Sequence, residues 1–140
     1  MDISEKSLYV KSSQLLGAGK GLFTSISIKK GDRIVEYKGR HVPWKVAKHQ
    51  DGNNAYLLRL NRTTAIDGHA FLKTFGRYAN DAKGFGKIVG MRNNAEYLIY
   101  GRKCFIVATR AIVNDEEILV GYGKVFWLLQ REVSKRKSIG

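Results

Sequence analysis

The sequence predicts a mainly β fold, a single small domain of several short strands with a few short helices. Its 140 residues are enough to build one hydrophobic core but not two. Apolar runs are short and are separated by glycine and asparagine, which favours many short strands over long helices. The only proline is Pro43, and the chain contains no internal repeats.

Eight segments combine a short apolar or alternating pattern with flanking turn residues, and we predict them to be strands. They are residues 8–10, 21–24, 33–37, 56–61, 65–67, 96–100, 103–108 and 117–120. The two-residue stretch Gly101-Arg102 separates segments 96–100 and 103–108. Glycine in the first position of such a loop is typical of a type II′ hairpin turn.

Two segments are predicted to be helical. Residues 43–50 begin with a proline, which is tolerated in the first helical turn. Residues 124–133 repeat apolar side chains on one face and predict a final helix of about three turns. Residues 82–94 contain three glycines and predict a loop, whereas residues 131–140 predict a basic C-terminal tail.

Composition excludes several classes of protein. No apolar run approaches the roughly 20 residues of a membrane-spanning helix, and residues 1–13 lack the apolar segment of a secretory signal. The single cysteine, Cys104, forms no internal disulfide, which suits a reducing compartment. One cysteine and three scattered histidines do not make a standard structural zinc site. We therefore expect an intracellular protein with no membrane partner and no metal.

The net charge is strongly positive, +13 at neutral pH. Such a surface attracts polyanions and acidic protein faces at long range. Two interpretations remain open: the positive charge serves solubility alone, or the basic surface contacts a nucleic acid, a nucleoprotein or an acidic protein face.

Four stretches have the composition of a ligand site. Residues 17–23 (GAGKGLF) contain three alternating glycines, which let the backbone turn sharply and approach a ligand. They form neither a Walker loop, because no Ser or Thr follows the lysine, nor a Rossmann turn, because a strand pattern follows. The others are residues 28–39 (IKKGDRIVEYKG), 75–82 (FGRYANDA) and 108–123 (ATRAIVNDEEILVGYG). In the last of these, glycines flank Tyr122 and leave its ring accessible.

In their order and spacing these stretches resemble the SET domain of protein lysine methyltransferases, over roughly residues 6–127. The matching family motifs are the cofactor loop (17–23), the KGDxIxEYxG strand (30–39), the RFIN sequence (77–80) and the closing GEExxxxYG segment (115–123). The resemblance implies a SET domain over residues 1–130, with several short curved sheets and a knot-like C-terminal substructure. Because no cysteine-rich segment accompanies it, the chain is similar to the minimal, zinc-free members.

The resemblance also implies roles for individual residues. Tyr122 would be the catalytic tyrosine, and Tyr56 a second tyrosine of the lysine channel. Contacts to S-adenosylmethionine would come from Ala18, Gly19, Lys20, Arg77, Asn80, Asp81 and Trp127. The protein substrate would meet Tyr37 and Tyr78.

The chain departs from the family pattern after the RFIN-like sequence. Asp81-Ala82 stands where the family has His-Ser, and a glycine-rich loop precedes Asn94, which takes the place of a later asparagine. Glu116 and Glu117 do not indicate a hydrolase with paired carboxylates, because adjacent strand residues point to opposite faces.

The implied activity is S-adenosylmethionine-dependent lysine N-methylation of a histone or another basic protein, in the nucleus of a eukaryote or otherwise in the cytoplasm. The acceptor lysine must lose its proton, and its ordinary pKa is about 10.4. An apolar channel and a nearby positive sulfonium would both lower that pKa. Two alternatives remain open, a SET-like binding module without catalysis and a small basic nucleic-acid-binding β domain.

Overall fold

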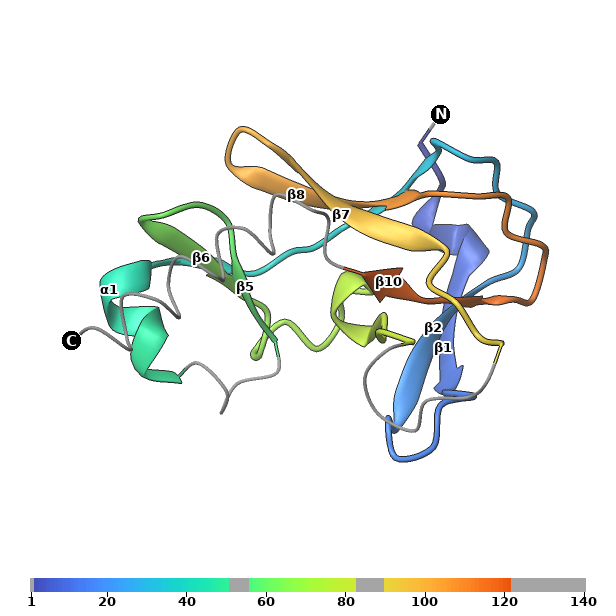
Figure 1. The fold of residues 1–140 in the computed structure, drawn as a ribbon, viewed down its shortest axis with the longest axis horizontal. Helices are drawn as coiled ribbons and strands as arrows, with labels where there is room; N and C mark the ends of the chain where they lie inside the picture. Colours follow the sequence, from blue (N-terminus) through green and yellow to red (C-terminus); the bar gives the residue numbers. More distant parts are fainter. Residues whose placement is uncertain (1, 51–55, 83–89, 122–140) are drawn as a thin grey trace.

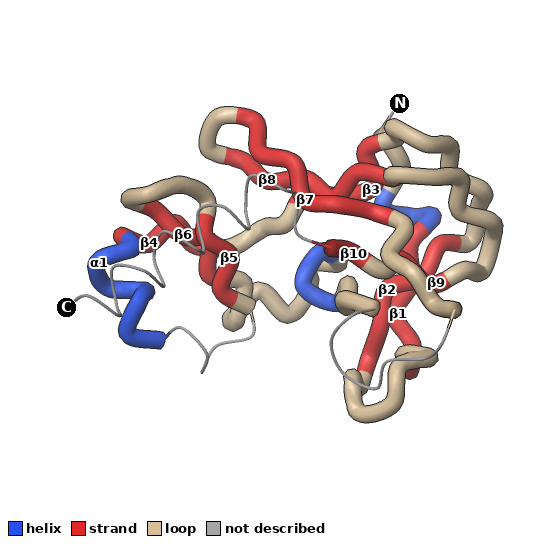
Figure 2. The backbone as a smooth tube through the Cα atoms, viewed as in Figure 1, coloured by secondary structure: helices blue, strands red, loops and turns tan. Residues whose placement is uncertain are grey.

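The structure, a computed structural model, describes residues 2–50, 56–82 and 90–121. Within these ranges ten short strands form three small sheets, joined by a few short helices, as Figures 1 and 2 show. The strands are β1 (Leu8–Ser12), β2 (Lys20–Thr24), β3 (Arg33–Glu36), β4 (Arg40–Pro43), β5 (Leu57–Arg59), β6 (Thr64–Asp67), β7 (Ala95–Tyr100), β8 (Lys103–Ala108), β9 (Glu117–Ile118) and β10 (Val120–Gly121). The helices are η1 (Glu5–Ser7), α1 (Trp44–Ala47), η2 (Lys48–Gln50) and η3 (Gly76–Tyr78). The prediction of a mainly β fold is confirmed.

The first sheet has the order β1-β2-β9. Its β1–β2 pair is antiparallel, and β9 adds to β2 with Leu22 opposite Ile118. Both faces of β2 are covered, because Leu22 and Phe23 are each fully buried. Tyr9 stacks on Phe23 with the ring centroids 5.6 Å apart. The sheet therefore gives the loop between β1 and β2 a rigid base.

The second sheet has the order β10-β7-β8-β3. The hairpin β7–β8 turns at Gly101, whose φ is +61°, as a type II′ turn requires of its first central residue. One face of this sheet and the first sheet share the main core, whose fully buried members include Leu22, Ile34, Ile106, Ile112 and Ile118. The predicted hairpin is therefore confirmed.

The third sheet has the order β4-β6-β5, and α1 lies next to it at one end of the molecule (Figure 1). The guanidinium carbon of Arg59 lies 4.4 Å from the ring centroid of the buried Trp44. Arg59 also donates hydrogen bonds to the carbonyls of Asn61 and Arg62. The predicted helix 43–50 is present as α1 and η2, with Pro43 as the N-cap of α1.

The chain changes sheets at Leu119. Residues 117–120, predicted as one strand, are split: β9 pairs with β2, and β10 pairs in parallel with β7. Val120 N donates to Asn80 O at 2.8 Å, and Ala95 N donates to Leu119 O at 3.1 Å. Residues 119–120 thus lie between the segment that contains Asn80 and the segment that begins at Ala95. This arrangement is the described part of the expected knot-like substructure. The predicted helix 124–133 and tail 131–140 lie outside the described residues.

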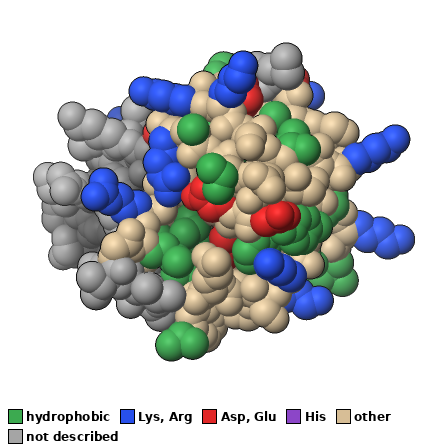
Figure 3. Space-filling view, turned by 90° about the vertical axis from the view of Figure 1, so that its right-hand side faces the viewer, with side chains coloured by type: hydrophobic (Ala, Val, Ile, Leu, Met, Phe, Trp, Pro, Cys, Tyr) green, Lys and Arg blue, Asp and Glu red, His purple; other side chains and the backbone are tan. Residues whose placement is uncertain are grey.

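The end of the molecule formed by the first sheet carries mixed charge. Figure 3 shows lysine and arginine side chains around the rim of this face and acidic side chains nearer its centre. Two exposed ion pairs also bring opposite charges together, Arg33 with Asp2 at 3.4 Å and Lys38 with Glu5 at 3.6 Å. The positive charge of the protein is therefore not gathered into one patch on this face.

Candidate active site

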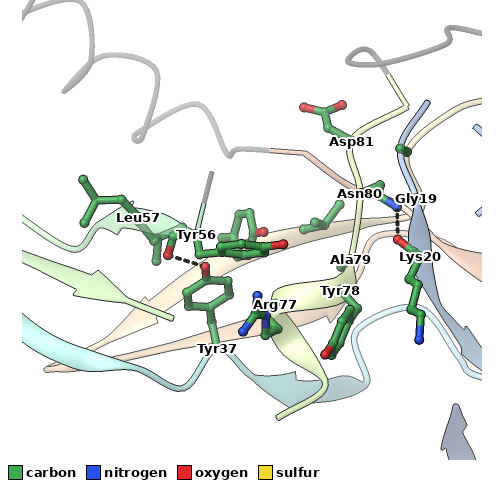
Figure 4. A pocket seen from close by; sticks show the side chains of 14 residues that line it. Gly19, Lys20, Tyr37, Tyr56, Leu57, Arg77, Tyr78, Ala79, Asn80 and Asp81 are labelled. Atoms are coloured by element: carbon green, nitrogen blue, oxygen red, sulfur yellow. Dashed lines mark hydrogen bonds between the residues drawn. The ribbon is translucent and has the colours of Figure 1, made fainter. Parts of the chain in front are cut away.

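A cavity of about 570 Å³ lies between the first and third sheets, where η3 and the end of β10 meet (Figure 4). Its lining comprises Ala18, Gly19, Lys20, Tyr37, Tyr56, Leu57, Leu58, Arg77, Tyr78, Ala79, Asn80, Asp81, Tyr97 and Val120. Nine of these are site residues predicted from the sequence: Ala18, Gly19, Lys20, Tyr37, Tyr56, Arg77, Tyr78, Asn80 and Asp81. The other two predicted site residues, Tyr122 and Trp127, lie outside the described part of the chain.

The glycine loop forms one wall of the cavity. Gly17 and Gly19 have φ angles of +78° and +73°, which side-chain-bearing residues adopt only at a cost. The loop is closed by hydrogen bonds from Ser13 N to Gly19 O (2.8 Å) and from Ala18 N to Leu15 O (3.2 Å). Among the described residues, no atom outside the loop lies within 4 Å of a Cβ placed at Gly17 or Gly19.

Glu117 anchors the glycine loop through hydrogen bonds to the residues that precede it. Its buried carboxylate accepts hydrogen bonds from Ser13 Oγ at 2.7 Å and from Gln14 N at 2.9 Å. A Cβ at Gly21 would overlap Oε2 of Glu117, so a side chain at position 21 would displace this carboxylate. The carboxylate thus fixes the glycine loop from a strand some hundred residues later in the sequence.

The helix η3 forms the opposite wall. A Cβ at Gly76 would lie 2.8 Å from Glu36 O, so glycine lets η3 sit directly on the end of β3. Asn80 Nδ2 donates to Lys20 O at 2.9 Å and ties this wall to the glycine loop. The same residue accepts from Val120 N, and it therefore links both walls to β10.

Asp81, which stands where the family has histidine, has a structural partner. Its Oδ1 accepts a hydrogen bond from Asn93 Nδ2 at 2.9 Å, and Asn93 Oδ1 accepts one from Ala82 N at 2.8 Å. These two bonds join the segment after η3 to the segment that precedes β7. The tie to Asn93 was not predicted, because nothing in the sequence relates positions separated by the glycine-rich loop.

Tyrosines line the part of the cavity nearest the third sheet. Tyr37 is buried, and its hydroxyl donates to Tyr56 O at 2.5 Å. The ring of Tyr97 meets that of Tyr37 edge-on, with centroids 5.9 Å apart and an interplanar angle of 85°. Tyr97 was not among the predicted site residues. The signal that points to it is its strand parity with the buried Ala95, which turns both side chains inward.

The thiol of Cys104 lies beneath these rings, in one apolar cluster with Tyr37, Leu58, Leu60 and Ile66. Burial first, and the negative charge of Glu36 second, raise the pKa of Cys104 to about 12. A thiol with that pKa stays protonated at neutral pH and is a poor nucleophile. Cys104 is therefore a core residue of the site's floor.

Neither adjacent carboxylate enters the cavity, in agreement with the rejection of a paired-carboxylate site. Glu116 accepts from Val113 N at 3.0 Å and pairs with Arg110 at 3.2 Å, away from the Glu117 partners Ser13 and Gln14. Among the residues that the structure describes, no group of three or more His, Cys, Asp or Glu is arranged to hold a metal ion. In the same ranges no helix is long and apolar enough to cross a membrane.

The fold is shared with the methyltransferase domain of human PR domain-containing protein 2. The two superpose with a TM-score of 0.64 at 23% identity, over 86% of this chain and 79% of that one. The two chains therefore share one fold. The sequence model of the SET domain matches residues 19–123, and the chain belongs to the SET-domain family.

Two curated relatives carry lysine methyltransferase names. The N-lysine methyltransferase KMT5A-B of Xenopus laevis is 28% identical over 126 residues, which are 81% of this chain and 36% of that protein. A Plasmodium falciparum protein named as a histone-lysine N-methyltransferase is 30% identical over 123 residues, which are 82% of this chain and 2% of that protein. The chain therefore spans about a third or less of the length of these relatives.

Proposed function

We propose that this chain is an S-adenosylmethionine-dependent protein-lysine N-methyltransferase. The observation that carries the proposal is the convergence of nine residues with implied roles, from widely separated parts of the sequence, on one cavity. Membership of the SET-domain family and the names of the relatives support the same reaction.

The cavity fits the proposed cofactor in size and in chemistry. Its volume of about 570 Å³ lies within the usual range for sites that take a small ligand. Ala18, Gly19 and Lys20 of the glycine loop line the cavity, and Asn80 and Asp81 complete that side of the lining. When bound, S-adenosylmethionine would supply an electrophilic methyl carbon that bonds to the acceptor nitrogen as the carbon–sulfur bond breaks and its electron pair goes to sulfur.

The residues of the chain would prepare the acceptor amine. The rings of Tyr56, Tyr37 and Tyr97 line one part of the cavity. They would exclude water there, and exclusion of water disfavours the charged ammonium. The hydroxyl of Tyr37 donates a hydrogen bond to the backbone carbonyl of Tyr56, and this bond fixes the position of Tyr37 relative to Tyr56. We assign alignment of the amine to Tyr122 and Tyr56, which is catalysis by positioning. The proton that the ammonium loses would pass to solvent water.

We propose a histone or similar basic protein, carried in a nucleoprotein, as the substrate, and hence a nuclear or other intracellular location. The relative named for histone lysines supports this substrate class, and the net charge of +13 favours a polyanionic carrier. His41 Nε2 lies 2.7 Å from Arg102 O and brings β4 beside the tip of the β7–β8 hairpin. Arg40, Arg102 and Lys103 are exposed along this edge and would meet the phosphates.

The decisive experiment is transfer of radiolabelled methyl from S-adenosylmethionine to core histones, free and in nucleosomes, by the wild type and Tyr122→Phe. Calorimetric binding of S-adenosylhomocysteine, with Asn80→Ala as the weakened variant, reports on the cofactor side alone. Binding without transfer by the wild type would make the chain a SET-like binding module. Salt-sensitive DNA binding without any cofactor binding would make it a nucleic-acid-binding domain.

A further inference from the structure

Arg77 makes its contacts on the tyrosine side of the cavity. Its guanidinium carbon lies 3.9 Å from the ring centroid of Tyr56 and 5.4 Å from that of Tyr78. Nη1 donates to His69 O at 2.7 Å and fixes the side chain in place. Figure 4 shows Arg77 beneath the ring of Tyr56, between Tyr37 and Tyr78. The family resemblance implied a cofactor contact for this residue, whereas its contacts are those of the tyrosine wall.

Within the described part of the chain, the guanidinium has no anionic partner. Its Nε is buried and has no hydrogen-bond partner among the described residues. No acidic side chain in the described ranges forms an ion pair with Arg77. An arginine keeps its proton under all ordinary conditions, so the cavity contains a fixed positive charge against one face of Tyr56.

A cavity walled by tyrosines has an inherent disadvantage for lysine chemistry. Aromatic rings attract an ammonium through cation–π interaction, and that attraction favours the protonated lysine, which has no lone pair with which to attack. A cation that already covers one face of a ring weakens the attraction at the other face and repels a second cation nearby.

We propose that Arg77 is a positioning residue that makes the tyrosine wall select the neutral amine. It would do so by stacking under Tyr56, which fixes the ring and opposes binding of the ammonium. This inference rests on the proposed lysine acceptor, and it assigns Arg77 to the acceptor side of the cavity. The residue would thus contribute to deprotonation of the substrate without accepting a proton.

Other ionisable groups also lie in or near the cavity, and the test must distinguish the effect of Arg77 from theirs. The charged and titratable side chains of the lining are Lys20, Asp81 and the tyrosines 37, 56, 78 and 97. The His69 imidazole lies 6.0 Å from the Tyr56 ring. His69→Gln is the matched control, because it removes the imidazole and keeps the backbone carbonyl that anchors Arg77.

The test compares the pH dependence of methyl transfer to core histones in the wild type, Arg77→Lys, Arg77→Met and His69→Gln. Removal of the charge in Arg77→Met should move the alkaline rise upward by about one pH unit, so that transfer at pH 7 falls roughly tenfold and recovers at high pH. Arg77→Lys and His69→Gln should keep the wild-type midpoint. S-adenosylhomocysteine should bind all four proteins equally.

A second readout needs no turnover. Tetramethylammonium chloride, a permanent cation, should bind Arg77→Met roughly tenfold more tightly than the wild type in an NMR titration against potassium chloride. A uniform loss of rate in Arg77→Met with an unshifted midpoint, and unchanged tetramethylammonium affinity, would overturn the proposal. If the wild type transfers no methyl but the affinity change is found, the proposed function fails, while the finding that Arg77 opposes a cation at the tyrosine wall stands.

Discussion

Asn94 and Leu119 exchange two hydrogen bonds: Asn94 N donates to Leu119 O at 2.8 Å, and Leu119 N donates to Asn94 Oδ1 at 2.9 Å. The fully buried amide of Asn94 also donates to Glu117 O at 2.9 Å and to Glu116 Oε2 at 3.0 Å. One side chain thus holds the backbone at the point where the chain leaves the first sheet for the second.

Asn94→Ala should lower the free energy of unfolding by about 3 kcal/mol, because it leaves buried backbone groups at 117 and 119 without partners. Urea unfolding of the two proteins measures the difference. Asn114→Ala is the control, since Asn114 is exposed and should change stability by less than about 0.5 kcal/mol. Equal effects at the two positions would contradict the role given to Asn94.

Gly21→Ala should destabilise the protein by about 2 to 3 kcal/mol, because the new Cβ displaces the buried carboxylate of Glu117. Gly17→Ala meets no neighbour among the described residues and should cost only about 1 kcal/mol, from its φ of +78°. A double-mutant cycle with Glu117→Ala provides the check. In that background the cost of Gly21→Ala should nearly vanish, and full additivity would refute the steric explanation.

Stability should fall as the pH rises from about 9 to about 12, because the pKa of Cys104 is raised to about 12 in the folded protein. Over that interval the folded state keeps a proton that the unfolded state loses, and proton loss then favours unfolding. Cys104→Ala should flatten this dependence. Tyr9→Phe is needed as a control, because desolvation and the hydrogen bond to Asp115 also raise the pKa of Tyr9.

Tyr122→Phe should reduce turnover by two orders of magnitude or more, comparable to the loss of one well-placed transition-state contact. The free energy of unfolding should change by less than about 1.5 kcal/mol, as for one modest hydrogen bond. A melting curve and a single-turnover assay on one preparation measure both. Retained turnover with a large fall in melting temperature would make Tyr122 a core residue instead.

Local patterns predicted most strands, because short apolar alternation and glycine turns determine them directly. The hairpin at Gly101 is the clearest case. The strand β4 was not predicted: its residues are largely exposed, and it ends at Pro43, so neither alternation nor composition marks it. The break at Leu119 was missed for a different reason, since the partners of β9 and β10 come from different sheets and leave no local signature.

The site was predicted through family motifs, and the packing among its residues was not. The resemblance placed Asn80 and the glycine loop together, and the structure adds the bond from Asn80 Nδ2 to Lys20 O. The contact of Arg77 with Tyr56 could not be inferred, because it joins two segments through a stacking geometry that spacing does not encode. The roles of Tyr122 and Trp127 stay predictions.

The position of Glu117 has a consequence for the order in which the protein matures. During synthesis the β1–β2 hairpin, the third sheet and the β7–β8 hairpin can each form as soon as their residues leave the ribosome, since their partners are near in sequence. The hydrogen bonds from Ser13 and Gln14 to Glu117 form only after β9 has been synthesised. Until residue 117 has been synthesised, the glycine loop therefore lacks these two bonds, and we expect the binding cavity to form after the three sheets.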